Sequence, residues 1–225
     1  CRRFVTENIK MWQPLYQRLG RQTHFQPPYQ TMDLDYMARE WQIWAKLVEQ
    51  GFVYSGCKVM PYCPECETVL SISEATSEDV YKLITTTAVH VRFRLSPRSE
   101  AELIAKFPKL KAPIYLVAFT TTPWTLPGNA ALAIGKFDYL AKYDNEYQAT
   151  HIYLDQDGQR GMLVNYTDLL YKTYLPINNS VNQEQKILLG PFVKEEGTGI
   201  VHIAPMFGQD DYNLCMDEKI SMPPN

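Results

Sequence analysis

The chain has 225 residues, of which 45% are hydrophobic and 21% are charged, and its formal net charge at pH 7 is −3. This balance is typical of globular proteins with one or two domains, and it excludes a disordered or low-complexity chain. The net negative charge also argues against a free-standing nucleic-acid binder, so any RNA partner is expected to be held mostly by something else.

No apolar run reaches the roughly 18 residues of a membrane span, and the N-terminus lacks the pattern of a signal peptide. The five cysteines are an odd number spread along the chain, which favours reduced thiols over a disulfide framework. We therefore expect a cytoplasmic protein without a membrane partner. Because the chain begins at Cys1 without an initiator methionine and ends on the letters SMPPN, we also expect a piece of a longer protein.

Residues 1–80 form the first of two predicted parts, and their composition is helical and aromatic. Residues 33–51 predict an amphipathic helix, with Asp33 as its N-cap and Gly51 directly after its end. The apolar stripe of this helix consists of Met37, Trp41, Trp44 and Val48. Such stripes usually exist to be buried, so we expect core packing here rather than a cofactor site.

A C-x-x-C sequence at Cys63 and Cys66 follows two predicted short strands that are separated by a glycine turn within residues 51–62. Two thiolates at this spacing can supply half of a tetrahedral zinc site. The remaining cysteines are isolated and offer no second pair. Three alternatives stay open: a complete zinc site within the chain, a half-site completed by residues beyond Asn225, and a structural remnant without metal.

Residues 81–225 form the second predicted part, which is rich in short β-strands. The predicted strands lie within residues 85–95, 112–122, 130–135, 139–143, 151–154 and 199–205. A helix is predicted around residues 166–174. Many short strands with few long helices favour an α+β fold, either a small barrel or an irregular α+β domain.

Two segments of this part concentrate polar residues at strand ends. In residues 119–129 (FTTTPWTLPGN), three consecutive threonines precede a strand break at Pro123. In residues 195–213 (EEGTGIVHIAPMFGQDDYN), Gly197 and Gly199 permit an unusual backbone path before the strand that carries His202, and Asp211 follows. Threonines, a histidine and a carboxylate are compatible with a hydrolytic site.

Each of these features also has a simpler interpretation. The threonines could belong to an edge strand with exposed hydroxyls, and His202 could be a hydrogen-bonded core histidine. Asp210 and Asp211 could cap a helix that starts there. No G-x-S-x-G segment is present, so a serine triad is not supported. The residues alone therefore predict a candidate pocket and no named reaction.

The two segments TTTPWTLPGNAALAIG and GTGIVHIAPMFGQDDY resemble the signature segments of the editing domain that is inserted in isoleucyl-tRNA synthetases. Residues 31–75 resemble the segment that leads into this insertion. The resemblance implies a small β-barrel-like editing domain with surrounding helices at residues 81–225. It implies a helical and half-ribbon linker segment at residues 1–80.

The resemblance also assigns roles to individual residues. Asp211 matches the position that binds the α-ammonium group of the misattached amino acid, and His202 matches the position that bounds the side-chain pocket. Asn129 matches a further polar position near the terminal adenosine. The residues that match the strip lining the cleft are Thr120, Thr121, Thr122 and Trp124.

The function implied is proofreading hydrolysis of valyl-tRNA(Ile), with tRNA(Ile) as partner, a monomeric state and no metal or other cofactor for editing. The H-x-G-H and K-M-S-K-S segments that bind ATP are absent from the sequence, so ATP and magnesium are expected only in the full-length enzyme. Two alternatives remain. One is a non-catalytic zinc-ribbon module for RNA binding or protein interaction. The other is a valyl- or leucyl-type editing domain, which Trp124 and His202 disfavour.

Overall fold

The computed structural model describes residues 1–21, 29–77, 83–155, 158–177 and 183–220. The chain divides into two compact units, Cys1–Cys57 and Lys58–Asn225, which are described separately. The sequence placed a boundary at residue 80 instead, and the assignment of domains to residues 1–80 and 81–225 stays a prediction. No helix among the described residues is both long enough and apolar enough to cross a membrane.

The first unit contains the helices α1 (Arg2–Arg18) and α2 (Leu34–Glu49). The predicted limits of α2 are confirmed: Asp33 is its N-cap, and Gly51 follows it with a positive φ of 75°. The expected burial of its apolar stripe is wrong for this unit, since Trp41 is 70% exposed and neither helix contains a buried residue. Periodicity encodes an amphipathic helix, whereas burial requires a partner surface that the described part of this unit does not supply.

The second unit begins with a small hairpin around the two cysteines. Strands β1 (Tyr62–Cys63) and β2 (Thr68–Val69) pair antiparallel, and the one-turn helix α3 (Ile72–Ala75) follows. Of the two strands predicted before Cys63, the first is absent from the described residues and the second is present only at Tyr62, because the pairing flanks the C-x-x-C turn instead of preceding it.

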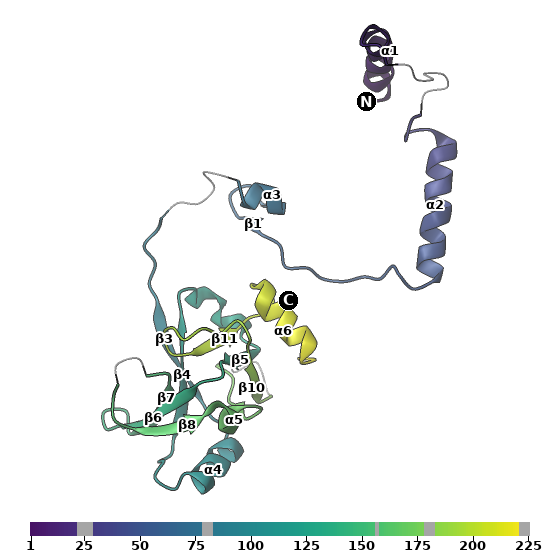
Figure 1. The fold of residues 1–225 in the computed structure, drawn as a ribbon. Coiled ribbons are helices and arrows are strands. Elements are labelled where there is room, and N and C mark those ends of the chain that lie inside the picture. The colour runs from purple at the N-terminus through teal and green to yellow at the C-terminus, as the bar shows by residue number, and fades with distance from the viewer. Residues whose placement is uncertain (22–28, 78–82, 156–157, 178–182, 221–225) are drawn as a thin grey trace. The chain divides into compact units, whose positions relative to one another are not determined.

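A five-stranded sheet forms one layer of this unit (Figure 1). In spatial order its strands are β3 (Val89–Arg94), β4 (Ile114–Thr120), β7 (Ala149–Tyr153), β6 (Asp138–Asp144) and β8 (Met162–Asn165). Only the β4–β7 pair is parallel. Strand β4 lies between β3 and β7, although β7 pairs only with its first three residues. The interpretation of an edge strand with exposed hydroxyls is wrong for Thr120, which is buried, whereas Thr121 and Thr122 lie after the strand.

A four-stranded sheet forms the second layer, with β5 and β10 as its inner strands. In spatial order its strands are β11 (Ile200–Ile203), β5 (Ala131–Ile134), β10 (Gln185–Leu189) and β9 (Thr173–Tyr174). The described strands of both sheets form open sheets, so the α+β class is confirmed, whereas the barrel-like shape stays a prediction.

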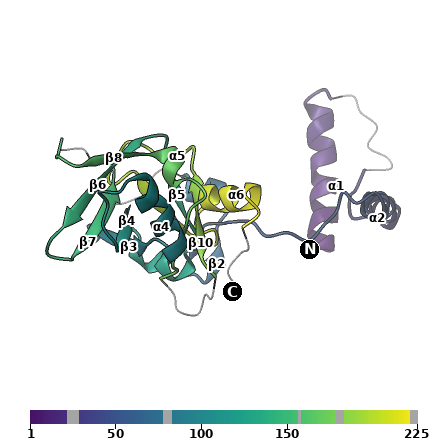
Figure 2. The ribbon, with the colours of Figure 1, turned by 90° about the horizontal axis from the view of Figure 1, so that it is seen from below.

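Three helices complete this unit, and Figures 1 and 2 show α4 and α6 at separate places on it. They are α4 (Pro97–Lys106), α5 (Tyr166–Leu169) and α6 (Gln209–Asp217). The predicted helix at residues 166–174 is only the single turn α5, followed by β9. The sequence interpretation missed α4, although Ser96 caps it and Pro97 occupies its first position.

The four-stranded sheet separates two apolar clusters. One face, with Leu132 and Ile200, joins the inner face of the five-stranded sheet and Leu103 of α4. The other face, with Ala131 and Ile203, packs against Leu214 of α6. His202 pairs with Leu132 in the ladder and therefore shares the face that points toward the first sheet. This alternation brings His202 toward the end of β4.

The turn before β11 is fixed by a close fit of backbone to side chains. Gly197 and Gly199 have positive φ values of 58° and 62°, as the sequence predicted for an unusual backbone path. A Cβ on Gly199 would also lie 2.9 Å from Leu154 Cβ. The buried Tyr139 hydroxyl accepts a hydrogen bond from Gly135 N–H at 2.9 Å and donates one to Gly199 O at 2.8 Å. These contacts set where β11 starts and hence where His202 lies.

Candidate active site

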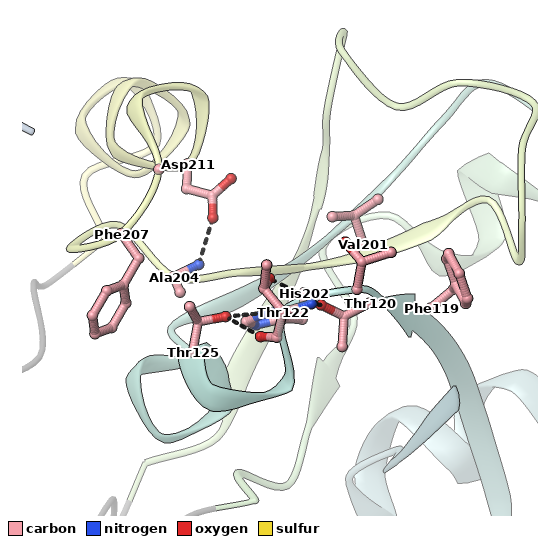
Figure 3. A pocket seen from close by; sticks show the side chains of 11 residues that line it. Phe119, Thr120, Thr122, Thr125, Val201, His202, Ala204, Phe207 and Asp211 are labelled. Atoms are coloured by element: carbon pink, nitrogen blue, oxygen red, sulfur yellow. Dashed lines mark hydrogen bonds between the residues drawn. The ribbon is translucent and has the colours of Figure 1, made fainter. Parts of the chain in front are cut away.

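A cavity of about 320 Å³ opens where β4 ends beside β11 and the start of α6 (Figure 3). Its lining combines the two polar segments with an apolar rim. The lining residues are Phe119, Thr120, Thr121, Thr122, Thr125, Val201, His202, Ala204, Phe207, Gly208 and Asp211. Five of the seven predicted site residues therefore surround one cavity: Thr120, Thr121, Thr122, His202 and Asp211.

The threonines do not play equivalent parts, because the strand ends among them. Thr120 is the last residue of β4 and is 7% exposed, and its hydroxyl accepts a hydrogen bond from Thr122 N–H at 3.1 Å. The 3₁₀ helix η1 (Pro123–Gly128) begins directly after Thr122. Thr121 is exposed, and its hydroxyl has no hydrogen-bond partner among the described residues. Thr121 is thus the threonine whose hydroxyl is available to a ligand.

His202 is 5% exposed and is held by a residue that the sequence analysis did not name. The Thr125 hydroxyl lies 2.8 Å from His202 Nε2 and donates to Thr122 O at 2.9 Å. A hydroxyl has one proton to donate, so Nε2 must carry the hydrogen that Thr125 accepts. Burial lowers the pKa of His202, which keeps the imidazole neutral at pH 7.

Asp211 brings a carboxylate to the cavity from the first turn of α6. Its Oδ2 accepts a hydrogen bond from Ala204 N–H at 2.8 Å, and it forms no ion pair with a cation in the described part of the chain. Burial raises the pKa of this carboxyl, although the Ala204 N–H opposes the shift. Gly208, and neither aspartate, is the N-cap of α6, so the helix-cap interpretation is wrong in detail.

Gly208 lies close to this carboxylate. A Cβ on Gly208 would lie 3.1 Å from Asp211 Cγ, which is tighter than ordinary van der Waals contact. Figure 3 shows Asp211 reaching down from α6 on one side of the cavity and Phe119 on the other, with His202 and the threonines between them. The cavity therefore offers one unpaired carboxylate, a neutral imidazole and a free hydroxyl.

Comparison with known proteins identifies the family of this chain. Residues 1–180 match the family model described as tRNA synthetases class I (I, L, M and V). The chain belongs to the class I tRNA synthetases. The resemblance to isoleucyl-tRNA synthetases is confirmed by curated relatives within this family, which match almost the whole chain.

Two of these relatives are each 35% identical to the chain. The isoleucine–tRNA ligase of Treponema denticola aligns over 254 residues, with 98% of this chain and 23% of the relative covered. That of Tetrahymena thermophila aligns over 242 residues, with 99% and 21% covered. The chain of this class I synthetase thus spans less than a quarter of the length of these relatives.

A solved structure supports the fold. The crystal structure of GlLeuRS-CP1 matches with a TM-score of 0.50 and 22% sequence identity, covering 58% of this chain and 60% of that chain. At this identity the match concerns the fold alone. It agrees with a mixed α+β architecture built from more than one open sheet.

Two predicted site residues of this class I synthetase lie away from the cavity. Trp124 is 64% exposed on η1 and does not line the cavity. The Asn129 side chain is buried and donates to Ala131 O at 2.9 Å while it accepts from the Tyr174 hydroxyl at 2.7 Å. This geometry gives Asn129 a structural part at the start of β5, and its contact with an adenosine stays a prediction.

The cysteine pair has the local geometry of a single turn. Cys66 N–H donates to Cys63 Sγ at 3.4 Å, and this hydrogen bond lowers the pKa of the Cys63 thiol. The described residues contain no group of three or more His, Cys, Asp or Glu side chains that could hold a metal ion. Zinc at Cys63 and Cys66 therefore stays a prediction.

Sequence reasoning missed six lining residues whose importance depends on spatial neighbours. Thr125 looks like one more turn residue in the sequence, yet it contacts His202, which is 77 positions away. The other five have no ionisable or hydroxyl side chain that would mark them in the sequence: Phe119, Val201, Ala204, Phe207 and Gly208. The recurrence of threonine at 125 after the triple threonine was the only available signal.

We predict that Thr125→Val lowers the free energy of unfolding by about 1–3 kcal/mol, because it leaves His202 Nε2–H buried without an acceptor. Thr125→Ser retains the hydroxyl and is the matched control, for which we expect a smaller loss. Urea unfolding of both variants at pH 7 checks this. Equal stabilities of the two variants would contradict the hydrogen-bond assignment.

Proposed function

We propose that this chain is an editing domain that hydrolyses valyl-tRNA(Ile), the product of attaching valine to the tRNA for isoleucine. The observation that carries the proposal is the single cavity that joins Thr121, His202 and Asp211. The confirmed membership of the class I synthetases gives the reaction class its context. We further propose a cytoplasmic enzyme that meets tRNA as part of a longer synthetase.

The carboxylate of Asp211 supports recognition of the aminoacyl group. Taking a carboxylate out of water is unfavourable unless a cation or hydrogen bonds compensate, and here one backbone N–H is the described partner. The α-ammonium group of an aminoacyl ester would supply the missing positive charge through a charge-assisted hydrogen bond. Since every amino acid carries this group, Asp211 would register the substrate without distinguishing side chains.

The side-chain discrimination is assigned to His202. A cavity of about 320 Å³ lies at the lower end of the range for small-ligand sites, so added bulk is expected to clash. One methylene is worth only about 1–3 kcal/mol in a binding pocket, a general magnitude for which isoleucine and valine in this enzyme class are the standard example. A second site that admits valine and excludes isoleucine supplies the remaining selectivity. The neutral imidazole suits this part because it does not repel the substrate's ammonium group.

The hydrolytic step is assigned to a water molecule held near the threonines. Thr121 has a hydroxyl free to bind the ester or the water, while Thr120 and Thr122 are partly committed to each other. We propose that the substrate's own ribose hydroxyl helps orient the water. On this mechanism editing needs no metal or ATP, and ATP and magnesium serve only the synthetic reaction of the full-length enzyme. A monomeric state is also part of the proposal.

The decisive experiment compares deacylation of valyl-tRNA(Ile) and isoleucyl-tRNA(Ile) by the purified 225-residue chain. We expect the valyl ester to lose its amino acid faster than both the isoleucyl ester and the enzyme-free control. Release of labelled amino acid measures both rates. Equal hydrolysis of the two esters, or hydrolysis of neither, would reject the proposal for this chain.

If the bulk of His202 excludes isoleucine, His202→Ala should hydrolyse the isoleucyl ester at least about tenfold faster than the parent. One methylene accounts for roughly 10- to 200-fold discrimination. His202→Gln is the matched control, because it keeps bulk and an N–H for Thr125. We expect this control to retain preference for the valyl ester. Full discrimination by His202→Ala would make His202 a structural residue.

The charge of Asp211 is predicted to serve binding at the expense of stability. Asp211→Asn keeps an oxygen for Ala204 N–H but removes the carboxylate whose pKa is raised by burial. A raised carboxyl pKa means that ionisation destabilises the fold above the ordinary pKa, so the neutral variant should be at least as stable at pH 7. Deacylation of both esters should nevertheless fall by more than tenfold. Retained activity would contradict the ammonium-binding role.

We also propose that Cys63 and Cys66 supply half of a zinc site whose other ligands lie outside this chain. The turn hydrogen bond favours the thiolate form at Cys63, which is the form that binds zinc. This site would be separate from editing and would suit the alternative function of an interaction module. Zinc titration of the chain, with Cys63→Ser as the control, should show weak binding that the substitution abolishes; identical binding by both proteins would refute it.

A further inference from the structure

The outer face of the five-stranded sheet, which points away from the core, carries basic and aromatic side chains in one cross-strand row. The row runs through Arg94 on β3, Tyr115 on β4, His151 on β7 and Lys142 on β6. These four residues are direct partners in the ladders, so their side chains share one face. Arg94 and Lys142 are exposed, and Tyr115 and His151 are half-buried.

A stacked arginine lies beside this row. Arg92 is exposed on β3, and its Cζ lies 4.1 Å from the centroid of the Tyr147 ring and 5.8 Å from that of Tyr115. The ring of Tyr147 is also 5.8 Å from that of His151. Tyr147 is 52% exposed, so one aromatic surface remains open to solvent. Together with the row, Arg92 and Tyr147 complete what we call the outer face.

The turn between β6 and β7 holds Tyr147 in this position. Asp144 Oδ1 accepts hydrogen bonds from the backbone N–H groups of Glu146 at 2.8 Å and of Tyr147 at 3.4 Å. The turn backbone therefore binds one oxygen of the Asp144 carboxylate, while Oδ2 faces His151 and Glu146 lies exposed in the turn. The aromatic side chain is thus presented by a defined turn.

A hollow of about 320 Å³ adjoins the row. It is lined by Lys142, Tyr143, Asp144, Asn145, His151 and Tyr153. His151 Nε2 is buried and has no hydrogen-bond partner among the described residues, while its Nδ1 lies 3.8 Å from Asp144 Oδ2. Buried polar atoms are normally hydrogen-bonded, so this nitrogen marks a place where a further polar group fits.

We propose that the outer face binds a single-stranded RNA segment, namely the nucleotides that precede the acylated ribose. Bases of unpaired RNA stack on tyrosine rings and guanidinium planes, and arginine and lysine bind the phosphates. Arg92, Arg94 and Lys142 concentrate positive charge on a chain whose net charge is −3, which favours a polyanion at this place over the rest of the surface. This inference rests on the proposed function for the identity of the RNA.

The position of the outer face fits that partner. Tyr115 lies near the start of β4, and Phe119 near its end lines the editing cavity. Four residues of extended strand span about 13 Å. An RNA strand with its acylated end in the cavity can therefore reach the outer face within a few nucleotides.

The test measures binding of a non-acylated RNA stem with a single-stranded 3′ end, by fluorescence anisotropy over a range of salt concentrations. We expect Arg92→Gln and Tyr147→Ala each to weaken binding about tenfold, and Arg92→Gln to reduce the salt dependence. Tyr147→Phe keeps the ring and should bind like the parent. Arg98→Gln removes the same charge from exposed α4 and should also bind like the parent.

Deacylation kinetics separate this inference from the proposed function. If both hold, Arg92→Gln should raise KM for valyl-tRNA(Ile) and leave kcat unchanged. If the chain deacylates nothing but the anisotropy result is as expected, the RNA-binding face stands and the editing proposal fails. Equal loss in Arg92→Gln and Arg98→Gln would overturn the inference, since general charge would then account for binding. Unchanged RNA binding by folded Arg92→Gln and Tyr147→Ala would also overturn the inference. That result is expected if the outer face contacts protein instead of RNA.

Discussion

The hydrogen bond between the Thr125 hydroxyl and His202 Nε2 joins the two segments from which the candidate site is built. The two residues are 77 positions apart, and both are almost fully buried. The bond requires β4 to end at Thr120, so that η1 turns Thr125 back toward the sheet. It equally requires β11 to start at Ile200, which the Gly199 contacts determine. A shift of one residue in β11 would turn His202 to the opposite face.

Under the two proposals, the distribution of charge in the second unit assigns two kinds of recognition to two places. The cavity contains the carboxylate of Asp211 and a neutral His202, a combination that suits an ammonium group. The outer face carries Arg92 and Arg94, a combination that suits phosphates. An aminoacyl ester of RNA has both charges, with the ammonium at its terminus and the phosphates behind it. Two sites of opposite charge, connected by β4, therefore match the order of charges along such a substrate.

The sequence predicted those parts of the fold whose signals are local. Strand β4 follows from an apolar run ended by Pro123, and the turn before β11 follows from two glycines that both have positive φ. Helix α2 follows from its periodicity and its flanking residues. Strand β9 was not predicted, because it has only two residues and its ladder partner is β10. A local sequence pattern does not show which distant segment a strand pairs with. The barrel-like shape depends on how sheets close, which no single segment encodes.

The sequence predicted most of the candidate-site residues whose side chains are ionisable or carry a hydroxyl, and it did not show which of them face the cavity. His202 on β11 and Asp211 in the first turn of α6 have ionisable side chains, and both line the cavity. Asn129 has an equally polar side chain, but its amide group is buried and hydrogen-bonded to Ala131 and Tyr174. The residue type alone does not distinguish this structural part from a ligand contact.

The same limit explains the apolar stripe of α2, where periodicity identified a face that seeks burial without identifying its partner. Trp41 and Trp44 remain exposed within the described first unit, whereas the alternating residues of β4 find a second sheet to cover them. The chain spans less than a quarter of the length of its relatives, and its sequence pattern identifies the apolar face of α2 without identifying what packs against it. The candidate cavity differs in this respect, because all its described walls come from the second unit alone.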